Sequence, residues 1–185
     1  LYFDKSVMTA DRNERFTQRL RYFLADNEGG KEMTVQIAGK LLLLPESDGD
    51  GKFTDELKLP KEQVQKCAQG RKLSFHAVSG SKGNKKTYKG TVHLLQPEGL
   101  TVISDIDDTI KISNVTDRNK LLQNTFLKPY KPVAGMAGKY RQWAEKEKAD
   151  FIYLSASPWQ LYPGLSLFLK KYGFPEGVVD LLRIE

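Results

Sequence analysis

The sequence predicts two domains: an α+β, β-sandwich-like N-terminal domain over residues 1–97 and an α/β domain over residues 98–185. Three observations support this fold class. Short alternating or apolar runs separated by turn residues fill most of the first half, and longer strand and helix patterns alternate in the second. A Pro97-Glu98-Gly99 turn lies where the pattern changes, and a length of 185 residues fits one or two domains.

The first predicted element is a helix over residues 11–25. Asp11 followed three positions later by Glu14 resembles a capping box, which satisfies two free backbone N–H groups at a helix start. Four apolar side chains then fall on one face of the helix: Phe16, Leu20, Phe23 and Leu24.

The region from residue 33 to about residue 96 predicts short strands. Turn-forming clusters rich in Gly, Ser, Asp and Asn occupy residues 46–51 and 79–84. Short strands with such turns are typical of a small β-sandwich. The predicted strands cover residues 33–38, 40–44, 52–59, 72–78 and 86–95.

The second half predicts a strand–helix–strand–helix–strand order, which is typical of a parallel α/β sheet and here indicates a partial Rossmann-like sheet. Met136, Tyr140 and Trp143/Ala144 share one face of the first helix, and Gly173-Phe174-Pro175 ends the second. The strands cover residues 100–104, 151–154 and 178–184, and the helices cover residues 132–148 and 158–172.

Polar side chains follow the first two strands of this predicted sheet. Asp105-Ile106-Asp107-Asp108-Thr109 ends the first strand, and Ser155-Ala156-Ser157 ends the second. Ligands of parallel α/β sheets bind beyond the carboxyl ends of the strands, so we expect Asp105 and Ser155 to lie close together. The D-x-D-x-T pattern after an apolar strand therefore predicts a functional site.

The residue types of this site suit phosphoryl transfer. Asp105 is the candidate nucleophile, which would form an aspartyl-phosphate, and Asp107 is the candidate acid that protonates the leaving oxygen and then activates water. Two carboxylates so close raise one another's pKa. Mg²⁺ bound by Asp105 and Asp107 would reduce their repulsion. The expected phosphate-binding groups are Ser155, Thr109 and the backbone N–H groups of Ile106 and Asp107.

At these residues the chain resembles a known group of enzymes. D-I-D-D-T is similar to the first motif of the haloacid-dehalogenase-like phosphatases, and Ser155 to their second. The longer stretches E-G-L-T-V-I-S-D-I-D-D-T-I-K, N-T-F-L-K-P, P-V-A-G-M and Y-L-S-A-S-P-W-Q-L-Y-P resemble the actin-patch-associated phosphatidate phosphatases. That resemblance implies a haloacid-dehalogenase-like fold and Mg²⁺-dependent hydrolysis of phosphatidate to diacylglycerol. It also implies that Asp105 is nucleophile and metal ligand, that Asp107 is acid/base and binds metal through its carbonyl, and that Ser155 holds phosphate.

Two further motifs of that superfamily, a Lys and an acidic residue after later strands, have no counterpart in these residues. We therefore expect the chain alone to have little or no phosphatase activity. Lys111 is expected to be a solvated loop residue, with phosphate contact as the alternative. We also expect a second segment, the β domain or another protomer to cover the open edge of the first strand.

The composition of the chain limits which kinds of binding partner we expect. The net charge of +6 favours an anionic partner such as a phosphatidate-containing membrane surface, and nothing indicates sequence-specific nucleic-acid binding. One cysteine fits a reducing compartment, two histidines leave little for a zinc site, and no apolar run is long enough for a transmembrane helix. We expect a cytoplasmic protein that associates peripherally with membranes. Cytoskeletal or endocytic partners follow from the resemblance only. Two alternatives stay open: a phosphatase of another phosphate ester, and a non-catalytic module that binds anionic lipid or a partner.

Overall fold

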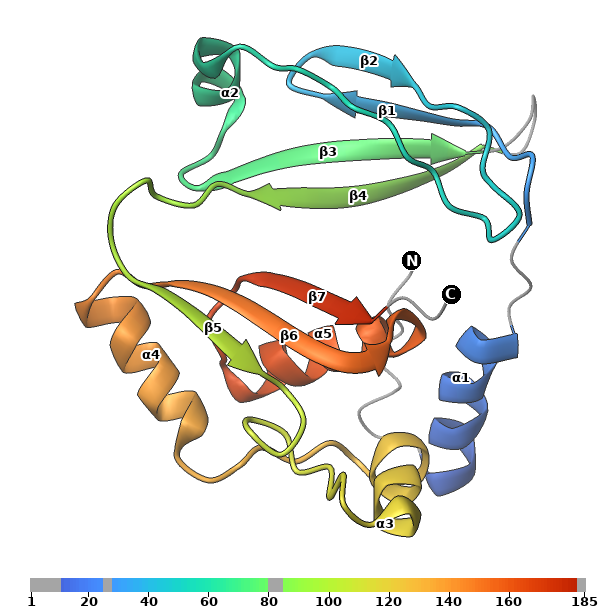
Figure 1. Cartoon of the computed structure of the whole chain (residues 1–185), viewed down its shortest axis with the longest axis vertical. Coiled ribbons are helices and arrows are strands. Elements are labelled where there is room, and N and C mark those ends of the chain that lie inside the picture. Colours follow the sequence, from blue (N-terminus) through green and yellow to red (C-terminus); the bar gives the residue numbers. More distant parts are fainter. Residues whose placement is uncertain (1–10, 25–27, 80–84, 183–185) are drawn as a thin grey trace. The chain divides into compact units, whose positions relative to one another are not determined.

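A computed structural model describes residues 11–24, 28–79 and 85–182 of the chain (Figure 1). Their contacts divide the chain into two compact units. One unit contains the described residues between 28 and 95, and the other contains residues 11–24 together with residues 96–182. The two-domain assignment with a boundary after residue 97 stays a prediction.

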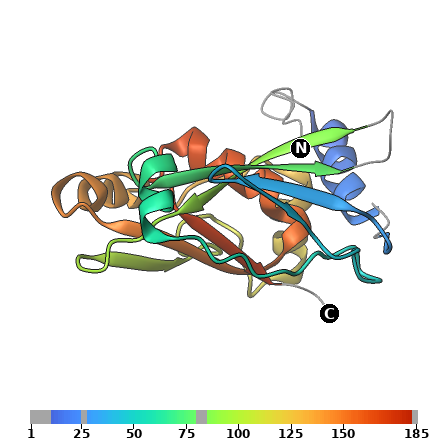
Figure 2. The same cartoon turned by 90° about the horizontal axis from the view of Figure 1, so that it is seen from above.

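The first unit is built on one antiparallel sheet in the order β2-β1-β3-β4. Figure 2 shows these strands from above. The antiparallel β region is confirmed, but the sandwich is not, because all four strands of the described part of this unit lie in a single sheet. The strands are β1 (Met33–Ile37), β2 (Lys40–Leu43), β3 (Lys72–Ser79) and β4 (Lys86–His93).

The predicted strand over residues 52–59 is wrong. That segment is irregular and leads through Pro60 into the short helix α2 (Lys61–Cys67), which the sequence analysis missed. Alternating polarity indicates that one face of a segment is exposed to solvent. A strand also needs a neighbouring strand that hydrogen-bonds to its backbone N–H and C=O groups. Gln63 of α2 instead donates a hydrogen bond to the Ala38 carbonyl at 2.7 Å, at the β1–β2 turn.

Helix α1 (Arg12–Leu24) starts with the predicted capping box. The Asp11 Oδ1 accepts a hydrogen bond from the Glu14 N–H at 2.9 Å, and the Asp11 N–H donates to the Glu14 carboxylate at 3.3 Å. The predicted apolar face is only partly right, because Phe16 and Leu24 are exposed and Arg19 is the buried residue.

The reason lies in what α1 packs against. Arg19 donates through Nη1 to the carbonyls of Thr125 at 2.5 Å and Lys128 at 3.0 Å, and Phe23 meets Phe126 edge to face. All three partners belong to the second unit, and α1 therefore packs with that unit and not with the β region to which the sequence assigns it. Guanidinium–carbonyl bonds can hold a helix without a continuous apolar stripe.

The second unit contains the predicted parallel sheet, in the order β5-β6-β7 (Figure 1). The strand and helix order of the prediction is confirmed, and two short elements between β5 and α4 were missed. The elements are β5 (Thr101–Asp105), α3 (Arg118–Leu122), the π-helical turn η2 (Gln123–Leu127), α4 (Met136–Lys146), β6 (Asp150–Pro158), the 3₁₀ turn η3 (Trp159–Leu161), α5 (Tyr162–Tyr172) and β7 (Val178–Leu182).

One aromatic-rich core joins the helices α4 and α5 to the central strand β6. Tyr140 of α4 stacks on Phe151 of β6 and contacts Phe174 edge to face, and Phe168 of α5 packs against the same Phe174. Gly173 ends α5 in the left-handed conformation with φ 68°, as the Gly-Phe-Pro signal predicts. Backbone pairing holds β5 beside β6, with Val102 opposite Phe151 of this core and Asp105 opposite Leu154.

Strand β5 lies at the edge of the described part of this sheet, where it pairs only with β6. Ile103 on this strand is 65% exposed. The prediction that another segment or protomer covers this edge stays a prediction. No helix among the described residues is long and apolar enough to cross a membrane.

Candidate active site

A tight loop carries the acidic cluster beyond the end of β5. The Ile106 N–H continues the pairing with β6 by donating to the Leu154 carbonyl at 3.0 Å, and the Ile106 side chain is fully buried. The N–H groups of Ile110 and Lys111 both return to the Ile106 carbonyl, at 3.0 and 2.9 Å. The loop therefore turns back at once, and Asp108 takes a left-handed φ of 58° at the turn.

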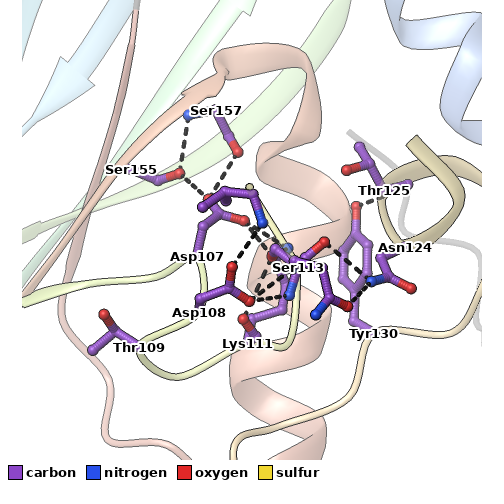
Figure 3. Close-up of polar contacts among 12 residues, drawn as sticks. Asp107, Asp108, Thr109, Lys111, Ser113, Asn124, Thr125, Tyr130, Ser155 and Ser157 are labelled. Atoms are coloured by element: carbon purple, nitrogen blue, oxygen red, sulfur yellow. Dashed lines mark hydrogen bonds and ion pairs between the residues drawn. The ribbon is translucent and has the colours of Figure 1, made fainter. Parts of the chain in front are cut away.

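Asp107 is the centre of the site (Figure 3). Its Oδ2 accepts hydrogen bonds from the hydroxyls of Ser155 at 2.7 Å and Ser157 at 3.1 Å, both at the end of β6. The Ser157 N–H donates to the Ser155 hydroxyl at 3.0 Å, which orients it. The structure brings the polar ends of β5 and β6 together, but the carboxylate that Ser155 contacts is Asp107 and not Asp105 as expected, since the hydrogen bond to the Asp105 carboxylate comes from Thr109.

Lys111 is a member of the site that the sequence analysis did not recognise. The expectation of a solvated loop lysine is wrong, because Lys111 is 2% exposed and its Nζ lies 2.7 Å from the Asp107 Oδ1. The Ser113 hydroxyl donates to the same Oδ1 at 2.6 Å and also contacts the Lys111 Nζ. The Nζ further lies 5.0 Å from the centre of the Tyr130 ring. The local pattern gave no signal for this, because Ile110 next to Lys111 is fully buried as well and the two do not alternate.

The surroundings of Asp107 decide its charge. Burial by itself would raise the pKa of this carboxyl group. The charge of Lys111 and the hydrogen bonds from Lys111, Ser113 and Ser155 outweigh burial and hold the pKa below its ordinary value. The prediction that neighbouring carboxylates raise this pKa is therefore wrong for Asp107 in this structure, because the nearest charge is a cation.

Asp108, the third carboxylate of the motif, has a structural role. Its Oδ1 accepts the backbone N–H groups of Ser113 and Asn114, and its Oδ2 accepts that of Val115, all at 2.7 Å. Asn124 of η2 holds the same loop by donating to the Ser113 carbonyl at 3.0 Å. These contacts fix the loop that carries Ser113 against Asp107.

Asp105 is the exposed carboxylate of the site. Among the described residues only Thr109 hydrogen-bonds to it, from its hydroxyl to the Asp105 Oδ2 at 3.0 Å. The other oxygen is open to solvent and to an incoming group. Of the two predicted backbone donors, the Ile106 N–H is engaged by Leu154, while the Asp107 N–H has no acceptor in the described part of the chain. The phosphate-binding roles of Thr109, Ile106 and Ser155 stay predictions.

The donor set fits a hard cation that keeps most of its water. No group of three or more acidic, His or Cys side chains suited to a metal occurs in the described residues. Mg²⁺ in proteins is commonly held by one or two carboxylates, waters and substrate phosphate oxygens. The open oxygen of Asp105 and the carbonyl of Asp107 supply the kind of oxygen ligands this needs.

Fold and site together define a class: an α/β unit with an acidic site where two parallel strands of its sheet end. Residues 100–185 match the family model described as the catalytic domain of phosphatidate phosphatase APP1. Over these residues the chain is similar to the APP1 phosphatidate phosphatases, which supports the resemblance found in the sequence.

Two curated relatives match about half of the chain. The chain is 36% identical over 93 residues to phosphatidate phosphatase APP1 of Saccharomyces cerevisiae, covering 47% of this chain and 15% of the relative. It is 34% identical over 93 residues to an uncharacterised protein of Schizosaccharomyces pombe, covering 49% of this chain and 15% of that protein. The chain therefore spans about 15% of the length of both relatives. No solved structure matches the chain.

Proposed function

We propose that the second unit is the part of a Mg²⁺-dependent phosphatidate phosphatase, of haloacid-dehalogenase-like fold, that forms an aspartyl-phosphate. The observation that carries the proposal is the combination of an exposed carboxylate, Asp105, with a half-buried and hydrogen-bonded one, Asp107, two residues further on. The match of residues 100–185 to the model of the APP1 catalytic domain supports phosphatidate as the substrate.

In the proposed first step Asp105 attacks the phosphorus atom. Its open oxygen forms the new P–O bond, the bond to the diacylglycerol oxygen breaks, and Thr109 holds the other carboxylate oxygen in place. The leaving oxygen needs a proton, and Asp107 is the nearest acid in the motif. Bound Mg²⁺ would neutralise charge on the phosphoryl oxygens.

The second step, hydrolysis of the aspartyl-phosphate, uses Asp107 as a base. The ion pair with Lys111 keeps Asp107 ionised in this structure, which is the state that accepts a proton from water. The acid role in the first step needs the protonated state. A phosphate dianion beside the loop raises the pKa of Asp107, because like charges disfavour ionisation.

The proposed setting is a membrane surface. Phosphatidate is an anionic lipid, and the net charge of +6 draws the chain toward anionic headgroups. Peripheral association with the cytoplasmic face of a membrane is part of this proposal.

The nucleophile is tested without requiring turnover. Beryllofluoride with Mg²⁺ mimics a phosphoryl group on a nucleophilic aspartate, and ¹⁹F NMR of the 185-residue chain detects the adduct. The adduct is expected with the wild-type chain, absent in Asp105→Asn and retained in Asp108→Asn, the matched control in the same loop. An adduct that survives Asp105→Asn would overturn the assignment.

Substrate class is tested by phosphate release. Radiolabelled phosphatidate in detergent micelles is compared with soluble esters such as glucose 6-phosphate, with and without Mg²⁺. Preference for phosphatidate supports the proposal, and preference for a soluble ester would replace the substrate but keep the chemistry. Single-turnover amounts of protein are used, so that slow phosphate release is also detected.

A further inference from the structure

A hollow lies in the second unit, between α1, the segment after η2, and α5. Its empty space is about 460 Å³ when solvent at its open mouth is included, and the volume open to the centre of a water molecule is about 50 Å³. Its walls are largely aromatic and aliphatic, and three of these wall residues come from α5: Leu167, Phe168 and Tyr172. Neither Asp105 nor Asp107 lines it, so it is separate from the acidic site.

Three cations line this hollow, and none of its lining residues is acidic. Arg15 and Arg19 come from successive turns of α1, and Lys171 comes from the end of α5. Positive charge around an apolar hollow favours an anion, because the field is focused by low-dielectric walls.

Arg19 gives the second, independent observation. It is 8% exposed, and its guanidinium lies 4.0 Å from the centre of the Tyr130 ring. Its Nη1 donates to two backbone carbonyls, but its buried Nε has no hydrogen-bond partner in the described part of the chain. A buried cation that is satisfied only by neutral carbonyls gains most from an added anion. Burial also lowers the pKa of Arg19.

We propose that this hollow binds the headgroup of an anionic phospholipid, at a site distinct from the one that performs the chemistry. The phosphate oxygens lie among Arg15, Arg19 and Lys171, and the glycerol and first methylenes of the lipid cover the apolar walls. A free phosphate ion would pair with the cations but leave the half-buried Leu167 in contact with water, which makes a lipid the better match.

The aromatic ring of Tyr130 lies between the hollow and the acidic site. Tyr130 contacts Arg19, which lines the hollow, and Lys111, which pairs with Asp107. Figure 3 shows Tyr130 beside the loop that carries Lys111. A lipid in the hollow would therefore anchor the acidic site close to the same membrane surface.

The test uses a lipid that is not a phosphate monoester and so cannot be hydrolysed at the acidic site. Short-chain phosphatidylglycerol below its micelle concentration is titrated into the full chain by calorimetry, beside phosphatidylcholine of equal chain length and inorganic phosphate. The expected order is phosphatidylglycerol well above both others. Equal binding of phosphatidylcholine would show an apolar groove only, and equal binding of inorganic phosphate a free-anion site; either result overturns the proposal.

Matched variants locate the binding. The double variant Arg15→Gln/Lys171→Gln removes two of the three cations that line the hollow. It should weaken phosphatidylglycerol binding by roughly tenfold or more, which corresponds to about 1.4 kcal/mol of binding free energy. Arg12→Gln with Lys170→Gln removes the same charge from positions on the same helices that do not line the hollow, and it should leave affinity within about twofold. Equal loss in both pairs would show general basic attraction and overturn the site.

Two more variants separate this proposal from folding effects and from the proposed function. Leu167→Trp fills the hollow without changing charge and should abolish binding, with thermal unfolding as the check that the unit still folds. Asp105→Asn should bind phosphatidylglycerol as the wild type does, because Asp105 does not line the hollow. Binding lost in Asp105→Asn would place the lipid in the acidic site and overturn the proposal, whatever the outcome of the beryllofluoride experiment.

Discussion

Replacing Lys111 by Met removes the cation beside Asp107 and keeps most of the aliphatic chain. In the wild type the Lys111 Nζ lies 2.7 Å from the Asp107 Oδ1, and the two side chains are 3% and 16% exposed. Removing one partner of a buried pair costs about 3–5 kcal/mol, because the remaining charge is left uncompensated. Three hydroxyl donors still reach Asp107, so we expect the lower end, about 3 kcal/mol.

The assay is urea unfolding followed by tryptophan fluorescence. Both tryptophans of the chain, Trp143 and Trp159, lie in the second unit, so the signal reports on that unit alone. A double-mutant cycle with Asp107→Asn isolates the pair, and the double variant should recover much of the loss.

The pH dependence gives a second readout with a definite sign. The native pKa of Asp107 is below its ordinary value of 3.8, so the pair's stabilisation is fully present above pH 3.8. It is lost as the pH falls through the lower native pKa. The stability difference between wild type and Lys111→Met should shrink at the acid end. A loss under about 1 kcal/mol at pH 7, or additive effects in the cycle, would refute the ion-pair argument.

Two further predictions concern other parts of the molecule. In the first unit, a Cβ at Gly90 would lie 2.1 Å from the Phe75 ring. Gly90→Ala should therefore lower the free energy of unfolding by about 1–3 kcal/mol, measured by circular dichroism, and Phe75→Leu should restore part of it. An unchanged free energy of unfolding would contradict the close approach. In the second unit, Asp108→Ala removes the acceptor of three backbone N–H groups and should cost about 1–2 kcal/mol, with faster amide exchange at residues 113–115. Unchanged exchange there would show that Asp108 does not hold the loop.

Much of the second unit could be predicted from sequence because its signals are local. Strand and helix periods, the Gly173 end of α5 and the D-x-D-x-T pattern each depend on neighbouring residues. The rule that polar strand ends meet at one edge of a parallel sheet was enough to bring the Asp and Ser groups together.

The first unit was harder to predict because its strand count depends on pairing between distant residues. Residues 52–59 alternate like a strand, yet no strand pairs with them in the structure. The alternation of polar and apolar residues indicates which side chains share a face. It does not indicate whether another strand is close enough to pair with the segment. The sandwich prediction failed for that reason.

By itself, the sequence determined the order of elements in the second unit, the capped start of α1 and the position of the acidic motif at a strand end. Only the tertiary structure decided the separate tasks of its carboxylates: Asp107 pairs with a buried Lys111, Asp108 holds the loop, and Asp105 stays open. The physical reason is that burial and charge pairing depend on what other segments bring to a side chain. The spacing of residues along the chain carries little of that information.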